Sequence, residues 1–232
     1  MRVFIDFDNT VTKGDVLNEM IGRYSISDDW MALEKAWQLG EISTKECLMG
    51  QMKGVRISRQ ELIKYLKTVR IDPYFSKLVD FLRMREIESS IVSDNFEPII
   101  DIILENNGIK DFKICGNHLK IYKDRLFPSF PYQNPNCSFC AHCKKVHFMD
   151  DTHSKNNPIV YIGDGRSDIC AAKEADVVFA KDTLLEYFKK HRLSCIEFND
   201  LSGVYEYLNG LPFGLVSCRQ PKLPSILYEK FE

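Results

Sequence analysis

The chain has 232 residues, and its 31 lysines and arginines nearly balance its 33 aspartates and glutamates, leaving a formal net charge of −2. This balance excludes a strongly basic nucleic-acid-binding protein. No apolar run approaches the roughly 20 residues that a membrane-spanning helix needs, and acids interrupt the first apolar segment where a signal peptide would continue. We therefore expect a cytoplasmic protein without nucleic-acid or membrane partners, whose eight cysteines form no disulfide framework.

The first predicted element is a strand at residues 3–7, a short apolar run that ends in acidic residues and a turn. Residues 14–69, which follow it, show no clear strand. Apolar residues recur there at helical spacing in three segments, residues 31–39, 44–52 and 58–68. Two of these segments are preceded by Ser-x-x-Glu, the spacing of a capping box. We expect a small helical cap inserted directly after the first strand.

Strands and helices alternate in the rest of the chain. Further strands are predicted at residues 89–93, 158–162, 176–180 and 195–198. Helices are predicted at residues 72–85, 97–106, 167–174 and 183–191. This alternation predicts an α/β fold with a doubly wound parallel sheet. Residues 1–13 and 70–211 would form this Rossmann-like core, and residues 14–69 the cap.

Two stretches depart from the alternation. Residues 115–151, approximately, contain prolines and clustered cysteines, and we expect an irregular excursion of the core there. Residues 212–232 contain further prolines and are expected to form a C-terminal tail that wraps the surface or is loose.

Acidic residues follow two of the predicted strands. Asp6 and Asp8 lie two residues apart, so strand geometry points both carboxylates to the same side. Asp164 and Asp168 follow the strand at residues 158–162, about one helical turn apart. Carboxylates held close together repel each other unless one is protonated or a cation lies between them. The two pairs therefore indicate a cation site at the carboxyl edge of the sheet.

A hydroxyl and an ammonium group complete this set. Ser93 ends a third strand at the same edge, and Lys144 and Lys145 follow the clustered cysteines. Carboxylates, a hydroxyl and a lysine together make a site for Mg²⁺ and a phosphate group. Open α/β sheets bind ligands at this edge, and the helical cap would lie over it.

In their order along the chain, these motifs resemble the four motifs of the haloacid dehalogenase (HAD) superfamily of phosphatases. DFDNT at residues 6–10 resembles the first, Ser93 after SSIV the second, Lys144 the third, and GDGRSD at residues 163–168 the fourth. The helical insert is similar to the type-I cap of phosphoserine phosphatase relatives. Within the superfamily, WMALEKAWQLGEISTKE in the cap and CGNHL before the cysteines are most similar to the phosphatases of 2-hydroxy-3-keto-5-methylthiopentenyl-1-phosphate in methionine salvage.

The resemblance implies a Mg²⁺-dependent phosphomonoesterase acting on a small phosphorylated metabolite. Asp6 would be the nucleophile that forms an aspartyl-phosphate, and Asp8 the general acid and then the general base. The implied metal group consists of Asp6, the backbone carbonyl of Asp8, Asp164 and Asp168. Asp168 would orient a metal-bound water or Lys144.

The resemblance also implies residues that bind the phosphate group or the rest of the substrate. Thr10, Ser93 and Lys144 would bind the phosphoryl oxygens. Asp94, with Asn95 after it, stands where many relatives carry glycines, and it is included among the predicted substrate-binding residues.

Three positions allow two interpretations each. Lys145 competes with Lys144 for the role of the active-site lysine. Asp15 either contacts substrate at the entry to the cap, as the resemblance implies, or caps the helix that follows it. Arg166 either points toward the site or is a solvated loop side chain.

Cys137, Cys140 and Cys143 form a Cys-x-x-Cys-x-x-Cys run. Three thiolates at this spacing can ligate a structural Zn²⁺. The candidates for a fourth ligand are Cys115, His118, His142 and His147. Such a site would stabilise a loop-rich stretch. The alternative is three reduced thiols in a loop.

Other functions remain open at this point. Phosphoserine phosphatase, or another small-molecule phosphatase with the same cap, is an alternative because selectivity depends on cap side chains. A phospho-acceptor or metal-dependent binding module is an alternative of a different class, although Asp8 and the helical insert argue against it. A cysteine knuckle for nucleic acid would need a basic surround, which is mixed here. The sequence predicts no oligomeric state.

Overall fold

A computed structural model describes residues 1–137, 140–148 and 157–211. Within these residues, one sheet has the strand order β4-β3-β2-β1-β5-β6-β7. The strands are β1 (Arg2–Ile5), β2 (Glu88–Phe96), β3 (Lys113–Tyr122), β4 (Arg125–Ser129), β5 (Ile159–Gly163), β6 (Val177–Ala180) and β7 (Ile196–Glu197). Neighbouring strands are parallel except β3 and β4, which form an antiparallel hairpin. The predicted α/β fold with a parallel sheet is confirmed.

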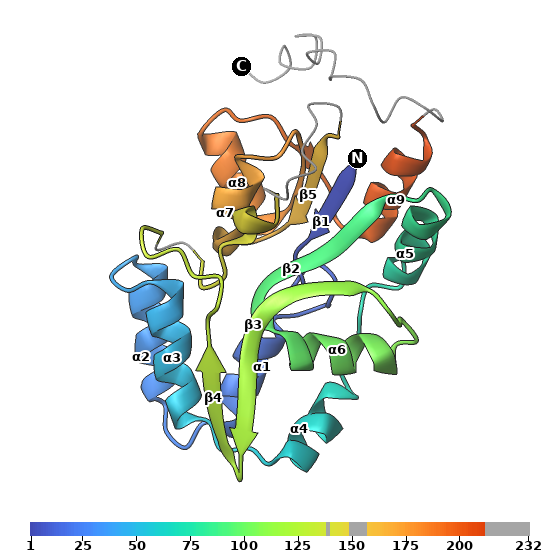
Figure 1. The fold of residues 1–232 in the computed structure, drawn as a ribbon. Helices are drawn as coiled ribbons and strands as arrows, with labels where there is room; N and C mark the ends of the chain where they lie inside the picture. The colour runs from blue at the N-terminus through green and yellow to red at the C-terminus, as the bar shows by residue number, and fades with distance from the viewer. Residues whose placement is uncertain (138–139, 149–156, 212–232) are drawn as a thin grey trace.

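Helices cover both faces of the sheet (Figure 1). On one face lie α5 (Phe75–Met84), α6 (Glu97–Asn106) and α9 (Leu201–Asn209). On the other lie the short α7 (Ile169–Ala172) and α8 (Asp182–Lys190). Successive side chains of a strand point to opposite faces: Val3 and Ile5 of β1 pack with the first group of helices, and Phe4 packs with the second. Strands buried on both faces explain the continuous apolar runs of the sequence.

Four helices follow β1 before the chain returns to the sheet: α1 (Val16–Tyr24), α2 (Asp29–Gln38), α3 (Thr44–Gly54) and α4 (Arg59–Leu66). They lie at the carboxyl end of the sheet, and the β3–β4 hairpin extends beside α3 (Figure 1). The outgoing and returning segments pair through an antiparallel bridge between Thr12 and Ile71. Both predicted capping boxes are present, at the starts of α3 and α4.

The structure differs from the sequence-based expectations in several elements. Part of the stretch expected to be irregular forms β3 and β4, where Leu119 and Ile121 alternate with polar residues. These strands were not predicted because the alternating pattern is short and is flanked by glycine, proline and cysteine residues, which indicated irregular structure. Helices α1 and α9 were not predicted. The predicted tail at 212–232 lies outside the described residues. No helix in the described ranges is long and apolar enough to cross a membrane.

Candidate active site

The candidate active site begins at the carboxyl end of β1, the strand at the centre of the sheet. β1 pairs with β2 on one side and with β5 on the other. Open α/β sheets form their ligand-binding crevice where the strand order reverses in this way. Asp6 follows β1 and Asp164 follows β5, so both carboxylates emerge at the same edge. Their residues are buried, with 5% and 8% of the surface exposed.

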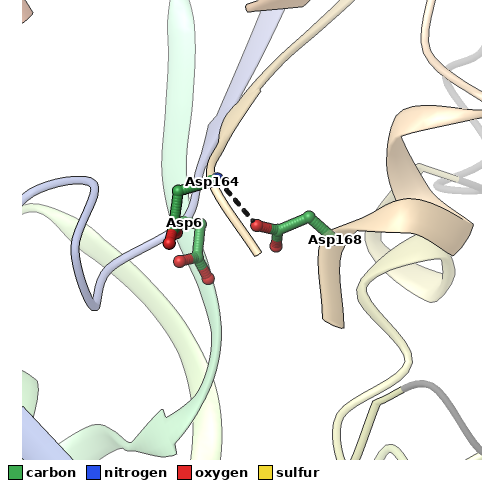
Figure 2. Close-up of side chains that lie close together, drawn as sticks. All are labelled: Asp6, Asp164 and Asp168. Atoms are coloured by element: carbon green, nitrogen blue, oxygen red, sulfur yellow. Dashed lines mark hydrogen bonds between the residues drawn. The ribbon is translucent and has the colours of Figure 1, made fainter. Parts of the chain in front are cut away.

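Asp6, Asp164 and Asp168 form an acidic cluster in which one carboxylate oxygen of each lies within 4.8 Å of the other two. Figure 2 shows the carboxylates of Asp6 and Asp164 side by side, with Asp168 reaching toward them. Burial raises the pKa of Asp6 to about 7. Burial and then the charge of Asp6 raise the pKa of Asp164 to about 9. Buried carboxylates that repel one another, and that offer hard oxygen ligands, fit a Mg²⁺ ion.

The carboxylate of Asp168 is held by donors of the protein itself. Its Oδ1 accepts hydrogen bonds from the Tyr161 hydroxyl at 2.6 Å and from the Lys144 ammonium. Its Oδ2 accepts from the backbone N–H groups of Asp164, at 3.0 Å, and Gly165, at 2.9 Å. Figure 2 marks the bond to Asp164 with a dashed line. Four donors therefore fix the orientation of Asp168.

The close approach of Asp168 to the backbone depends on Gly163, the last residue of β5. A Cβ atom at this position would lie 2.5 Å from Oδ2 of Asp168. Asp6 and Asp164, by contrast, accept side-chain hydrogen bonds at Oδ1 alone in the part of the chain that the structure describes. Their second oxygens remain for a cation, whereas the protein's own donors occupy both oxygens of Asp168.

Lys144 is the cation that faces this cluster. Its side chain is 1% exposed, and its Nζ lies 2.7 Å from Oδ1 of Asp6 and forms an ion pair with Asp168. Ser167 accepts a third hydrogen bond from it at 3.1 Å. Burial alone would lower the pKa of Lys144, but the charges of Asp168 and Asp6 outweigh burial and hold this pKa well above its usual value. Lys145 has no ion pair with a described residue, so the structure brings Lys144 to the acids.

Asp8 is held by two donors from different parts of the chain. Its Oδ1 accepts from the backbone N–H of Val16 and its Oδ2 from the side-chain amide of Asn95, both at 2.8 Å. Burial, followed by the charges of Asp15 and Asp6, raises the pKa of Asp8 well above its usual value. This direction favours the protonated form of Asp8, which is the form that a general acid requires.

The second motif lies in an irregular part of β2. The pairing of β2 with β3 shifts register between Val92 and Phe96. The three residues between them therefore leave the regular ladder at the edge where the acids lie. Ser93 is buried, and its Oγ accepts from the N–H of Asn95 at 3.1 Å. Asp94 accepts at Oδ1 from the N–H groups of Ala141 and His142, at 3.1 and 2.7 Å, and so anchors the segment before Lys144.

A pocket of about 120 Å³ lies between the cap helices and the edge of the sheet. Its walls from the core carry the predicted site residues Asp6, Asp8, Ser93 and Asp94, together with Asn95 and Ser167. Its walls from the cap carry Asp15, Leu17, Asn18, Ile21, Glu34, Trp37, Thr44, Cys47, Leu48 and Gln51. The pocket therefore joins the acidic cluster to a lining of mixed apolar and polar side chains.

The remaining predicted residues have identifiable contacts. The Thr10 hydroxyl donates to Oδ1 of Asp164 at 3.1 Å. Asp15 caps α1 by accepting from the N–H of Asn18 at 2.8 Å, and it also lines the pocket. Arg166 donates a hydrogen bond to the carbonyl of Trp37 in the cap, and its guanidinium lies 5.6 Å from the centre of the Trp37 ring. Arg166 thus links the fourth motif to the cap.

Tyr161, Asn95 and Ser167 contact the predicted catalytic groups but were not singled out in the sequence. Tyr161 lies in an apolar strand, where an aromatic ring is expected. The sequence therefore gives no separate indication that its hydroxyl contacts the site. A tyrosine hydroxyl inside a fully buried strand needs a hydrogen-bond partner. This requirement could have indicated that Tyr161 contacts a polar group of the site.

The fold and the site together define the class of the protein. A parallel sheet with helices inserted after its first strand, and a buried lysine among acids at the switch point, match the architecture predicted from the HAD motifs. The chain belongs to the "Putative Phosphatase" family, whose model matches residues 1–192. Its fold is similar to the solved structure "Phospho-Aspartyl Intermediate Analogue of Phosphoserine phosphatase", with a TM-score of 0.67, 20% sequence identity, and coverage of 88% of this chain and 97% of that chain.

Curated relatives cover most of the chain. It is 28% identical to Pdp3-interacting factor 1 of Schizosaccharomyces pombe, over 92% of this chain and 96% of that protein. It is 26% identical to 2-hydroxy-3-keto-5-methylthiopentenyl-1-phosphate phosphatase of Bacillus pumilus, over 81% of this chain and 82% of that protein. It is 27% identical to polyol phosphate phosphatase of Saccharomyces cerevisiae, over 87% of this chain and 90% of that protein.

Proposed function

We propose that the chain is a Mg²⁺-dependent phosphomonoesterase that hydrolyses a small phosphorylated metabolite through an aspartyl-phosphate on Asp6. The observation that carries this proposal is the position of Asp6, which lines the pocket while its Oδ1 pairs with the buried Lys144 at 2.7 Å. A carboxylate held by an ammonium group beside a second acid is a nucleophile placed for phosphoryl transfer. Membership in a phosphatase family supports the same reaction class.

The reaction follows from the contacts of the two acids after β1. Asp6 attacks phosphorus and the ester P–O bond breaks, while Asp8 gives its proton to the leaving oxygen. Asp8 then takes a proton from water, which attacks the phosphorus of the aspartyl-phosphate and releases inorganic phosphate. Lys144 offsets the negative charge near Asp6 in both steps. A Mg²⁺ ion held by Asp6, Asp164 and the backbone carbonyl of Asp8 would supply further positive charge for the phosphoryl oxygens.

The charge of the pocket wall narrows the substrate class. Asp15 and Glu34 contribute carboxylates, Asn18 and Gln51 contribute amides, and the lining contains no lysine or arginine among the described residues. A zwitterionic substrate such as phosphoserine would find acids for its ammonium group, but this lining offers no cation for its carboxylate. We therefore propose a phosphate ester whose organic part carries no carboxylate. A polyol phosphate and 2-hydroxy-3-keto-5-methylthiopentenyl-1-phosphate both satisfy this condition.

A substrate panel tests the proposal. Phosphate release is measured with and without Mg²⁺ for a generic phosphate ester, then for a polyol phosphate, the methylthiopentenyl phosphate and phosphoserine. We expect activity only with Mg²⁺, and a kcat/KM for phosphoserine at least about tenfold below that of the better neutral substrate, a difference of about 1.4 kcal/mol. Phosphoserine as the preferred substrate would overturn the assignment of substrate class, and no release from any ester would overturn the phosphatase itself.

Replacing Glu34 by glutamine should weaken the discrimination against a phosphate ester that carries a carboxylate and no ammonium group, such as 3-phosphoglycerate. The substitution removes one like charge from the pocket wall and keeps the hydrogen bond that Gln51 donates to this side chain at 3.1 Å. We expect the kcat/KM ratio of 3-phosphoglycerate to a polyol phosphate to rise by about tenfold. Glu41→Gln, at an exposed position of the same region, should leave the ratio unchanged. A ratio that is identical in both variants would contradict the proposed role of charge.

Replacing Asn95 by alanine should slow catalysis through Asp8. Loss of the 2.8 Å amide contact leaves the Asp8 carboxyl held by Val16 alone. We expect kcat to fall by about tenfold. The Mg²⁺ concentration at half-maximal rate should change little, because Asn95 contacts the side chain of Asp8, whereas the proposed metal ligand of Asp8 is its backbone carbonyl. Asn95→Asp should be slower still, since it places a second carboxyl group against Asp8. Asn106→Ala on the exposed side of α6 is the control, and equal rates in all three variants would argue against the contact.

Within this proposal, residues 14–69 form the cap, and residues 1–13 and 70–211 form the core. The pairing of Thr12 with Ile71, where the two connecting segments meet, supports these boundaries. We also propose that the cysteine run holds a structural Zn²⁺ ion and that the protein is located in the cytoplasm. The buried free thiols of Cys47 and Cys115 support a reducing compartment.

A further inference from the structure

Cysteines from two separate segments meet beside the acid–lysine cluster. Cys137, Cys140 and Cys143 precede Lys144, while Cys170 belongs to α7, two residues after Asp168. The Sγ atom of Cys137 lies 3.8 Å from that of Cys140 and 3.5 Å from that of Cys170. Cys143 lies three residues after Cys140 and directly before Lys144. Chain folding thus adds a fourth cysteine to the run of three.

These separations agree with a tetrahedral thiolate site. Four sulfurs at about 2.3 Å from a Zn²⁺ ion lie about 3.8 Å from one another. A disulfide would need about 2.05 Å between sulfurs, far below either distance. Only these two pairs, both of which include Cys137, are at contact distance among the described residues. No three of the four sulfurs lie within 4.8 Å of one another, so binding of an ion would have to draw the other sulfurs inward by side-chain rotation.

Backbone hydrogen bonds hold the first and the last cysteine of the run. The N–H of Cys137 donates to the carbonyl of Asn134 at 3.0 Å, and the N–H of Cys143 donates to the carbonyl of Tyr132 at 2.8 Å. Between them, Asp94 accepts from two N–H groups of the run. Cys140 and Cys143 are buried, with 2% and 3% of their surface exposed. Two of the four thiols are therefore buried before any ion binds, while Cys137 and Cys170 are half-buried.

The other candidates for a fourth ligand have different neighbours. The charged groups that act on Cys115, in β3, are Lys113 and Glu97, with no clustered cysteine among them. His118 lies 3.7 Å from Glu97. The Nε2 atoms of His142 and His147 lie 2.6 Å apart and bond to each other. Each of these side chains thus contacts groups other than the clustered sulfurs, whereas Cys170 touches Cys137.

The surroundings also supply a matching charge. Burial and then contact with Cys137 raise the pKa of the Cys170 thiol to about 11, while the charge of Lys145 acts in the opposite direction. Zinc binding replaces the thiol protons, which pass to solvent. Lys145 would then face a thiolate group of net negative charge. Lys144 pairs with the carboxylates, so Lys145 is the adjacent basic residue left to offset this charge.

We propose that Cys137, Cys140, Cys143 and Cys170 bind one Zn²⁺ ion as a structural tetrathiolate site. The ion would join the segment that ends in Lys144 to the helix that begins after Asp168. The helical elements that carry or adjoin these ligands are short: a 3₁₀ helix at Lys144–Phe148 and the four residues of α7. A metal clip contributes folding energy where the local core is small.

Metal analysis of the full chain, purified under reducing conditions with zinc supplied, tests this proposal. We expect roughly one Zn²⁺ per chain in the wild type. Cys170→Ser should reduce the zinc content at least about fivefold, because three thiolates hold the ion more weakly than four. Cys115→Ser should leave it unchanged. Zinc absent from the wild type, iron in its place, or zinc retained fully by Cys170→Ser would each overturn the assignment.

A second measurement on the wild type guards against a variant that fails to fold. The holoprotein is alkylated with and without a zinc chelator, and the modified cysteines are identified by mass spectrometry. We expect the chelator to increase alkylation at the four proposed ligands. Alkylation of Cys195, a half-buried cysteine that follows α8 in the chain, should not change. Unchanged alkylation, or a disulfide between Cys137 and Cys170, would contradict the site. Neither measurement uses substrate, so its failure is separable from failure of the phosphatase proposal.

Discussion

Replacing Asp6 by asparagine is expected to lower kcat by at least about 10⁴-fold, because the amide cannot form the aspartyl-phosphate and turnover falls to what the rest of the site supports. The contacts predict this size of effect. Asp6 lines the pocket and pairs with Lys144 at 2.7 Å, and no other described acid combines these two features. Phosphate release at saturating Mg²⁺ measures the loss. Mass spectrometry of the protein quenched during turnover should detect the added phosphoryl group in the wild type and not in the variant.

The same substitution should not destabilise the fold. It removes a buried carboxylate that lies close to Asp164 and Asp168, while the Lys144–Asp168 ion pair remains. We expect the free energy of unfolding without Mg²⁺ to stay within about 1 kcal/mol of the wild type or to rise. Asp101→Asn on the exposed side of α6 is the matched control and should keep full activity. Undiminished activity of Asp6→Asn would sink the assignment of the nucleophile.

Replacing Lys144 by methionine is expected to damage both stability and catalysis. Lys144 is fully buried and pairs with Asp6 and Asp168. Methionine fills a similar volume but leaves these acids without their cation, and breaking a buried ion pair from one side costs about 3–5 kcal/mol. Catalysis loses the positive charge near the nucleophile, for which we expect a drop in kcat of about 10²–10³-fold. Chemical unfolding measures the first effect and steady-state kinetics the second.

Lys145→Met is the control for this experiment, because it changes the same side chain at the next position. Lys145 makes no ion pair with any residue that the structure describes. We expect kcat within about twofold of the wild type and a loss of stability below about 1 kcal/mol. Equal losses in the two variants would mean that the adjacent lysines share the role, contrary to the contacts.

The sequence by itself determined the elements that depend on local patterns. Short apolar runs predicted the core strands, because a strand buried on both faces needs apolar residues throughout. Asp6, Asp8 and Asp164 followed from these strands, since a residue at the carboxyl end of a parallel strand must emerge at the same edge. The capping boxes of α3 and α4 were equally predictable, because their hydrogen bonds join residues three positions apart.

Only the tertiary structure decided how the groups at this edge pair with one another. Adjacent lysines are equivalent in a sequence, and burial against Asp168 selects Lys144. Asp168 is occupied by Tyr161 and by backbone N–H groups, and Cys170 meets Cys137 across 33 residues of chain. These contacts depend on how α7, β5 and the segment before Lys144 pack together. The spacing of residues along the chain does not predict such packing, because the sheet brings together residues that are far apart in the sequence.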